Sequence, residues 1–278
     1  MIQDIKPHQF DNQYKKLSPT RDSYLLYYEN NSCLLKEKEG EIFFPRFSEV
    51  EGYIENLYED YTYLFSIDDE SYYLLKTIDI ECLPEYKMMP KNEFRYLLPK
   101  YRAFAGITGM QLANWYRNRK FCGRCGSLMR HDEEERMMRC DQCGLMEFPK
   151  ICPAVIIGVT DGDRILLSKY AGRSYKYYAL LAGFTEIGET LEETVQREVM
   201  EEVGLKVKNI RYYKSQPWAF TDTMLMGFFC ELDGDGRIDL DEHELAMAEW
   251  FTREEVPVPI SMESLTNEMM MKFKNGEI

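Results

Sequence analysis

The stretch that decides the fold runs Gly183-Phe-Thr-Glu-Ile-Gly-Glu-Thr-Leu-Glu-Glu-Thr-Val-Gln-Arg-Glu-Val-Met-Glu-Glu-Val-Gly-Leu205. Within it, Glu198, Glu201 and Glu202 follow the i, i+3, i+4 spacing, so one helix would project three carboxylates across an arc of about 100°. Carboxylates crowded in this way are typical of a site for divalent cations. The spacing therefore indicates a metal-dependent reaction.

The same stretch carries signals for both ends of a helix. Thr190 and Glu193 have the spacing of a capping box, and Gly204 stands where a left-handed glycine would end the helix. Apolar residues on an adjacent arc would seat the helix on a sheet: Leu191, Val195, Val199 and Val203. The alternative is a solvated acidic helix in a chain with 48 Asp+Glu and 34 Lys+Arg. The fixed positions within one short stretch argue against that alternative.

Length and composition suggest two folded units with a small insert between them. The chain has 278 residues, of which 45% are hydrophobic, and it lacks an apolar run long enough for a membrane-spanning helix. The first residues contain no basic segment followed by an apolar one, so we expect a cytoplasmic protein without membrane association. The net charge of −14 disfavours indiscriminate binding to nucleic acid.

Four of the eight cysteines form a constellation. Cys122 and Cys125 make one CxxC pair, and Cys140 and Cys143 make a second, with 14 residues between the pairs. This pattern predicts a tetrahedral four-thiolate zinc site, although its separation is one residue shorter than the usual spacing. Iron in the same cage is the minority reading. The remaining four cysteines are expected to be buried apolar residues rather than catalytic groups.

The rest of the chain predicts strands around these motifs. Residues 1 to about 90 alternate apolar and polar in short segments, which predicts a small sheet domain. A connecting helix is expected over 92–119, with a break near Gly106 and Gly109. Segments 152–160 and 164–168 flank Asp161-Gly-Asp, a hairpin signal. Further strands are expected over 206–215, 224–231 and 247–251, with a terminal helix over 263–274.

A second motif, Ser215-Gln-Pro-Trp-Ala-Phe-Thr-Asp-Thr223, narrows the function. Together with the cysteine pairs, Tyr178–Phe184 and the glutamate stretch, it resembles the signature of the zinc-ribbon NADH pyrophosphatase family of Nudix hydrolases. The resemblance covers roughly residues 100 to 270. Three positions depart from it: Ala219 and Thr221 replace prolines, which frees two backbone dihedrals, and Thr223 replaces a serine but keeps a hydroxyl.

The resemblance implies an α+β protein. Its expected parts are an N-terminal β-rich domain over residues 1–117, ending in a connecting helix, a zinc ribbon over 118–149, and a Nudix α/β/α sandwich with a mixed sheet over 150–278. It also implies structural Zn²⁺ on the four cysteines and catalytic Mg²⁺ or Mn²⁺. The implied ligands of the catalytic metal are Glu198, Glu201, Glu202, Glu244 and the main-chain oxygen of Ala182. Arg197 would orient a neighbouring glutamate.

Substrate contacts follow from the same resemblance. Phe184 occupies the nicotinamide-stacking position, and the signature contributes Gln216, Pro217, Trp218, Ala219, Phe220, Thr221, Asp222 and Thr223. A late contact falls near Thr266, where the match is weak. Glu135 and Phe148 take positions that serve the partner subunit's site in the family, which implies a homodimer. Phe148 stands where the family has a tyrosine, so its ring can still stack but the hydrogen bond of the tyrosine hydroxyl is lost.

The implied activity is hydrolysis of the diphosphate in NADH or NAD⁺ to nicotinamide mononucleotide and AMP, by attack of metal-activated water on phosphorus. NAD caps at RNA 5′ ends are a further candidate substrate, because they present the same diphosphate. Two alternatives stay open. One is a Nudix hydrolase that prefers ADP-ribose or another nucleoside diphosphate derivative, and the other is a non-catalytic regulator that senses nucleotides. The intact set of Glu198, Glu201 and Glu202 argues against the regulator.

Overall fold

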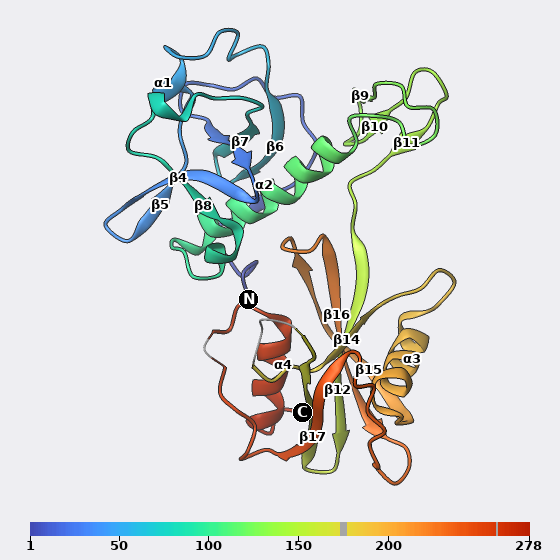
Figure 1. Ribbon diagram of the computed structural model, residues 1–278. Coiled ribbons are helices and arrows are strands. Elements are labelled where there is room, and N and C mark those ends of the chain that lie inside the picture. Colours follow the sequence, from blue (N-terminus) through green and yellow to red (C-terminus); the bar gives the residue numbers. More distant parts are fainter. Residues whose placement is uncertain (173–176, 260) are drawn as a thin grey trace. The chain divides into compact units, whose positions relative to one another are not determined.

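The computed structural model describes residues 1–172, 177–259 and 261–278. The chain divides into two compact units, shown in Figure 1. The N-terminal unit contains residues 2–150 together with the short segment Ala219–Asp222, and the C-terminal unit contains Met1, Ile151–Trp218 and Thr223–Ile278. Each unit is described by itself.

The N-terminal unit confirms the predicted small sheet domain with two four-stranded sheets. The first has the order β1-β6-β7-β2, and the second has the order β3-β4-β5 with β8 paired to β4. The strands are β1 (Phe10–Asp11), β2 (Tyr24–Leu26), β3 (Tyr28–Glu29), β4 (Ser32–Lys38), β5 (Glu41–Phe43), β6 (Thr62–Ile67), β7 (Glu70–Leu74) and β8 (Lys87–Pro90). Short helical turns join them: α1 (Phe47–Val50), η1 (Ile80–Cys82) and η2 (Lys91–Arg95).

Large aromatic side chains fill the core between these strands. Phe47 and Tyr73 are at most 1% exposed, and their rings meet edge to face at 5.5 Å. Offset and edge-on contacts of this kind are the preferred geometry of aromatic pairs. The aromatic residues of the alternating N-terminal segments therefore form the core of this unit.

The connecting helix differs from the prediction at its start and in its middle. Helix α2 spans Lys100–Asn118, after Pro99, and it runs unbroken through Gly106 and Gly109. The glycines permit close packing instead of a break. A Cβ on Gly106 would lie 2.2 Å from the Phe94 ring, and one on Gly109 would lie 2.4 Å from the Tyr28 hydroxyl. Helix α2 leads into a ribbon of three short strands, β9 (Arg130–His131), β10 (Met138–Arg139) and β11 (Met146–Glu147) (Figure 1).

The C-terminal unit contains a six-stranded mixed sheet in the order β15-β16-β12-β13-β17, with β14 paired to β12. Only the pairing of β12 with β16 is parallel among the described strands of this sheet, so the predicted mixed character is confirmed. The strands are β12 (Cys152–Asp161), β13 (Arg164–Tyr170), β14 (Leu181–Phe184), β15 (Val207–Trp218), β16 (Thr223–Leu232) and β17 (Leu245–Thr252). The predicted hairpin joins β12 to β13 at Gly162, whose φ is +60°.

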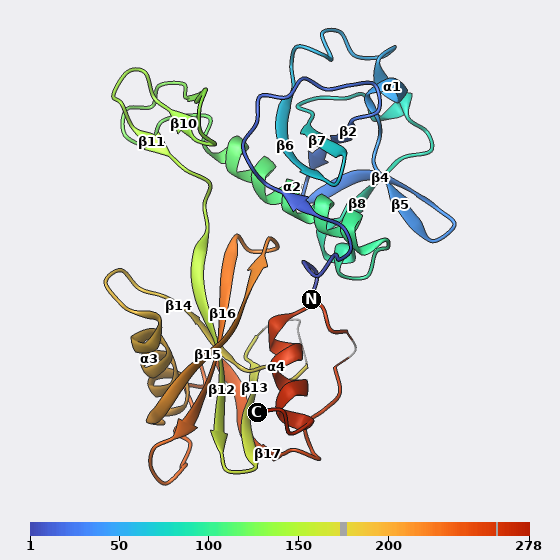
Figure 2. The ribbon, with the colours of Figure 1, turned by 180° about the vertical axis from the view of Figure 1, so that it is seen from behind.

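Two helices cover opposite faces of this sheet, which gives the predicted α/β/α sandwich (Figures 1 and 2). Successive residues of β12 alternate between the two cores because side chains on a strand alternate between faces. Val155 and Ile157 pack against α3 (Leu191–Val203), whereas Ile156 packs in the core of α4 (Leu265–Lys274). None of the helices in the described ranges combines the length and apolar character that crossing a membrane requires.

Both predicted ends of α3 are confirmed. The Thr190 hydroxyl accepts a hydrogen bond from the Glu193 amide, and the Glu193 carboxylate accepts one from the Thr190 amide. Gly204 ends the helix with φ of +68°, a conformation that glycine adopts without steric cost. The carboxylate-bearing helix therefore has fixed ends and a fixed seat on the sheet.

We expect Thr190→Ala to lower the free energy of unfolding by roughly 1 kcal/mol, because the first turn of α3 loses its capping hydroxyl. Urea titration followed by circular dichroism measures this change. Thr190→Ser keeps the hydroxyl and serves as the control. Equal destabilisation by serine and alanine would contradict a capping role.

Candidate active site

Glu198 lies where α3 meets β14, and a glycine makes room for it. The side chain projects from the helix onto Gly183, which pairs with Val155 on β12. A Cβ built on Gly183 would fall 1.8 to 2.2 Å from the carboxylate atoms of Glu198. Any side chain at this position would therefore displace the carboxylate of Glu198, a residue that is 8% exposed. The glycine of the sequence motif is required for close approach rather than for a turn.

Arg197 gathers the carboxylates around one guanidinium group. Its Nε donates to Glu189 Oε1 at 2.5 Å, and its NH2 donates to Glu189 Oε2 at 3.0 Å. Its NH1 donates to Glu198 at 2.8 Å and to Glu201 at 2.9 Å. NH2 also donates to the Phe184 carbonyl at 2.9 Å, which ties the arginine to the end of β14. A planar guanidinium with five donors suits this multiple role.

The pKa values of two glutamates in the cluster shift in opposite directions. The hydrogen bonds from Arg197 lower the pKa of Glu189 to about 2. Burial raises the pKa of Glu198, and the negative charges of Glu201 and Glu244 raise it further, while Arg197 opposes the shift. Glu189 is thus a permanent counter-ion for the arginine. Glu198 is a buried anion that would gain from added positive charge.

Glu202 and the segment of Glu244 meet at the last turn of α3. Glu202 is 2% exposed. Its carbonyl accepts a hydrogen bond from the Asp241 amide at 3.0 Å, and the Glu244 amide donates to the Asp241 carbonyl at 3.2 Å. These bonds hold the turn before β17 next to the helix. The charge of Glu244 is among the causes that raise the pKa of Glu198.

The donor set of this cluster fits a hard divalent cation. Carboxylate oxygens and main-chain carbonyl oxygens are the ligands that Mg²⁺ and Mn²⁺ prefer. The approach of Glu198 onto Gly183 brings its carboxylate beside β14, the strand that carries the Ala182 carbonyl. Across the described ranges, however, only the four cysteines already place three or more ligand atoms close together. Arg197 occupies the space between the glutamates, so rearrangement of the carboxylates must accompany metal binding.

The predicted substrate signature forms the end of β15, a tight tip and the start of β16. Trp218 pairs with Thr223, and Asp222 at the tip has a left-handed φ of +57°. The tip, Ala219–Asp222, groups with the N-terminal unit. There the buried Phe220 lies under the Arg95 guanidinium at 4.7 Å, and its carbonyl accepts a hydrogen bond from Lys91 at 3.4 Å. Proline is not needed to fix this tip, because Phe220 is anchored.

Gln216 has a structural role that the sequence motif does not indicate. Its side chain is fully buried, and its amide group bonds to the main chain before α4. Nε2 donates to the Glu263 carbonyl at 2.9 Å, and Oε1 accepts from the Leu265 amide at 2.7 Å. The residue therefore fixes the start of the helix that carries Thr266. Glu189, which holds Arg197, was also missed by the sequence analysis. Its position between Gly183 and Arg197 in the motif was the signal that could have indicated this role.

Three of the remaining predicted contacts lie on exposed positions, whereas Thr266 on α4 is only partly exposed. Phe184 at the end of β14 is 55% exposed, and Phe148 after β11 is 54% exposed. Glu135 is exposed in the turn between β9 and β10. Phe184 and Thr266 belong to the C-terminal unit, while Glu135 and Phe148 belong to the N-terminal unit. The side chains of Phe184, Phe148 and Glu135 are therefore open to solvent.

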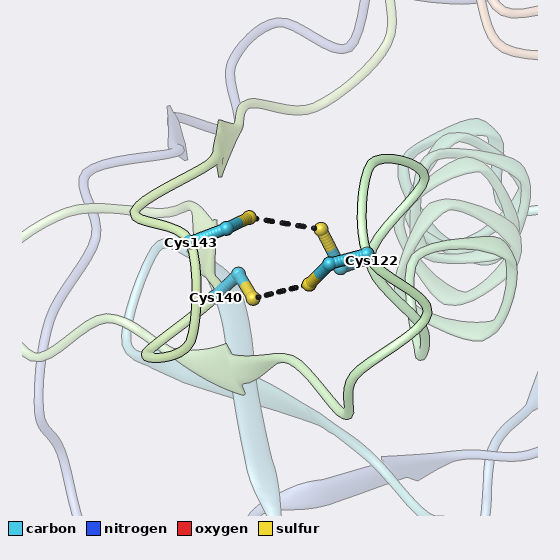
Figure 3. Close-up of side chains that lie close together, drawn as sticks. Cys122, Cys140 and Cys143 are labelled. Atoms are coloured by element: carbon cyan, nitrogen blue, oxygen red, sulfur yellow. Dashed lines mark hydrogen bonds between the residues drawn. The ribbon is translucent and has the colours of Figure 1, made fainter.

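The four cysteines of the ribbon come together as predicted. All four Sγ atoms lie within 4.8 Å of one another, and Cys122–Cys143 and Cys125–Cys140 are both 3.5 Å apart. Zinc–sulfur bonds of about 2.3 Å in a tetrahedron require Sγ separations of about 3.8 Å, so the cage fits zinc. Figure 3 shows Cys122 on one turn facing Cys140 and Cys143 on the other. Hydrogen bonds from Ser127 lower the pKa of Cys125 to about 6, which favours the thiolate.

We expect removal of zinc by a chelator to unfold the ribbon, because four-thiolate zinc contributes very roughly 10–16 kcal/mol to small zinc domains. Limited proteolysis within residues 120–148 measures the loss. Cys125→Ser should reproduce the effect, and Cys152→Ser, outside the cage, should not. A ribbon that stays protease-resistant after complete zinc loss would contradict the structural role.

We expect Gly183→Ala to push the Glu198 carboxylate away from β14. The added methyl group overpacks the site, which costs about 1–3 kcal/mol of stability, and the displaced carboxylate lowers the metal-dependent rate. Urea unfolding and initial rates at several magnesium concentrations measure the two effects. Gly52→Ala, where no atom lies within 4 Å of the new Cβ, is the control. An unchanged magnesium dependence in Gly183→Ala would be incompatible with this role of Glu198.

Comparison with known proteins agrees with this geometry. Residues 150–273 match the NUDIX domain, and residues 117–148 match the NADH pyrophosphatase zinc ribbon domain. The chain is 38% identical over 175 residues to the NAD-capped RNA hydrolase NudC of Haemophilus influenzae (strain PittGG), which covers 62% of this chain and 62% of that protein. It is 43% identical over 150 residues to the protein of that name from Salmonella heidelberg (strain SL476), covering 54% of this chain and 58% of that one.

The chain thus aligns with less than two thirds of the length of these curated relatives. Among solved structures, a NUDIX hydrolase from Nitrosomonas europaea covers 57% of this chain and 92% of its own, at 22% identity and a TM-score of 0.49, a likeness too weak to bear on function. The two domain matches adjoin each other and contain the cysteine cage and the carboxylate helix. The chain therefore belongs to the Nudix hydrolases that carry an NADH pyrophosphatase zinc ribbon.

Proposed function

We propose that this protein hydrolyses the diphosphate of NADH and NAD⁺ to nicotinamide mononucleotide and AMP, and that it also removes NAD caps from RNA 5′ ends. The observation that carries the proposal is the buried Glu198 on Gly183, within the carboxylate set that Arg197 gathers on α3. The zinc ribbon and the relatives named NAD-capped RNA hydrolase support the choice of dinucleotide substrates.

In this proposal the glutamates of α3 have separate tasks. Glu198, Glu201 and Glu202 hold Mg²⁺ or Mn²⁺ together with Glu244 and the Ala182 carbonyl. When bound, the cation would supply charge neutralisation for the phosphates and activation of water. Arg197 orients Glu198 and Glu201, and Glu189 keeps the arginine in place. A carboxylate of the set, Glu201, Glu202 or Glu244, accepts the proton of the attacking water.

Substrate recognition in the proposal rests on exposed rings and on a fixed loop. The Phe184 ring offers a face to the nicotinamide, since aromatic stacking contributes roughly 1–3 kcal/mol per base in other base-binding proteins. The more exposed residues of the signature, such as Pro217 and Trp218, contact the substrate. The buried Phe220 fixes the tip, and Gln216 acts through the start of α4 rather than by direct contact. Phe148 and Glu135 complete the site of a partner subunit in a homodimer.

The zinc cage also bears on where the enzyme works. Its four thiolates stay free of disulfides in a reducing compartment, where glutathione and thioredoxin keep thiols reduced. None of the eight cysteines, each of which is described, forms a disulfide. We therefore place the activity in the cytoplasm, where NAD(H) and RNA are both present.

The proposal is tested by chromatography of products from NADH, NAD⁺, ADP-ribose and a short NAD-capped RNA, each incubated with the protein and Mg²⁺ or Mn²⁺. Release of nicotinamide mononucleotide faster than cleavage of ADP-ribose is the expected result. Faster cleavage of ADP-ribose would assign the chain to a different Nudix activity. No cleavage with either metal would favour a nucleotide sensor.

We expect Glu202→Gln to lower kcat by roughly 10²-fold or more while the fold is kept, because a buried carboxylate of the metal set is neutralised. Single-turnover hydrolysis of NADH with circular dichroism of the same samples provides the measurement. Glu192→Gln removes an exposed acid from the same helix and should keep the wild-type rate. A near-normal rate in Glu202→Gln would remove this residue from the mechanism.

A further inference from the structure

Two adjoining pockets open on the N-terminal unit, and none of their lining residues is assigned to hydrolysis. They share three lining residues, Thr62, Lys76 and His131. The larger has a volume of about 540 Å³ and the smaller about 380 Å³. Both volumes are in the range of natural small-molecule sites, which is roughly 300–1,000 Å³.

The charge of these pockets is opposite to that of the whole chain. The protein carries a net charge of −14, yet no aspartate or glutamate lines either pocket. The larger pocket is lined by Lys76, Arg117 and Lys120, and the smaller one adds Lys15 and Lys16. Lys15 and Lys16 pair with Asp11 and Glu133, which lie outside the lining. The positive potential that attracts anions therefore comes chiefly from the cations of the larger pocket.

Part of this positive charge is not neutralised by neighbours. In the described part of the chain, no ion pair joins Arg117 or Lys120 to a carboxylate: Arg117 donates to the Tyr28 carbonyl at 3.0 Å, and the Lys120 ammonium lies 5.8 Å from the Phe121 ring centroid. Lys76 pairs with Asp60 at the surface, where both side chains are more than half exposed. Exposed pairs contribute little stability, so Lys76 can turn to a stronger anion.

An aromatic surface stands beside the cations. The His131 ring stacks on Tyr116, with ring centroids 4.7 Å apart and planes inclined by 14°. Desolvation by the groups packed around the ring and the charge of Lys76 lower the pKa of His131. The residue is exposed although Tyr116 covers one face. The floor of the larger pocket is apolar, with Leu75, Met129 and Met138 buried.

A flat ring and a negative group are therefore both accommodated within one opening. The ring of His131 offers a stacking surface, and Lys76 and Lys120 offer charge for a phosphate. We propose that this opening, the Lys76–His131 pocket, binds a nucleoside phosphate, either free or as part of an RNA chain. The pocket is a second nucleotide site that takes no part in hydrolysis.

Photolabelling of the full-length protein with 8-azido-AMP in magnesium-free buffer tests the proposal. Peptide mapping should find label in the segment from Tyr116 to Met138. Lys76→Glu and Lys120→Glu should each raise the AMP concentration needed for half-protection at least tenfold. Lys87→Glu makes the same charge change at an exposed lysine of another strand, paired with Glu37, and should leave protection unchanged. All three variants should hydrolyse NADH at the wild-type rate.

Competitors distinguish the source of the ligand. Adenosine should protect at least tenfold more weakly than AMP because it lacks the phosphate. Protection by AMP at lower concentration than a ten-nucleotide RNA assigns the pocket to free nucleotides, and the reverse order assigns it to an RNA chain. Equal protection by adenosine, or labelling unchanged in both Lys76→Glu and Lys120→Glu, would overturn the proposal. Because hydrolysis is measured separately, loss of NADH cleavage in the wild type would refute only the proposed function.

Discussion

The hydrogen bonds of the Arg197 guanidinium are the interactions on which the candidate active site depends. Carboxylates three and four residues apart on one helix repel each other, and Glu198 is also removed from water. Arg197 compensates by donating to Glu189, Glu198 and Glu201, and its bond to the Phe184 carbonyl anchors the group to β14. Arg197 thereby stabilises the cluster of glutamate carboxylates, which a divalent cation can rearrange when it binds.

The sheet positions both of its covering helices, with a glycine beside α3 and a buried polar side chain beside α4. Gly183 leaves room for the Glu198 carboxylate, and the capping box and Gly204 fix the two ends of α3. On the opposite face, Gln216 bonds to the main chain on both sides of the start of α4. Strand β15 thus fixes the start of α4 through Gln216, and it also carries the exposed side chains of the signature.

The sequence predicted the elements whose signals are local. The caps of α3, the β12–β13 hairpin and the cysteine cage each depend on residues a few positions apart or on a known spacing, and all three are confirmed. The break expected at Gly106 and Gly109 was wrong, because these glycines accommodate Phe94 and Tyr28, residues distant in sequence. The anchoring of Gln216 to residues 263–265 is also a long-range contact, which no local pattern could reveal.

Titration with Mn²⁺ followed by electron paramagnetic resonance tests most directly whether the carboxylates of α3 hold a divalent cation. The account predicts that the wild-type protein binds Mn²⁺ and that Glu198→Gln weakens this binding at least about tenfold. Even mutation of the groups that hydrogen-bond to a metal ligand costs about 10–100-fold in metal affinity. Glu192→Gln, which alters an exposed acid on the same helix, should bind like the wild type. Equal Mn²⁺ affinity in the wild type and in Glu198→Gln would contradict the account.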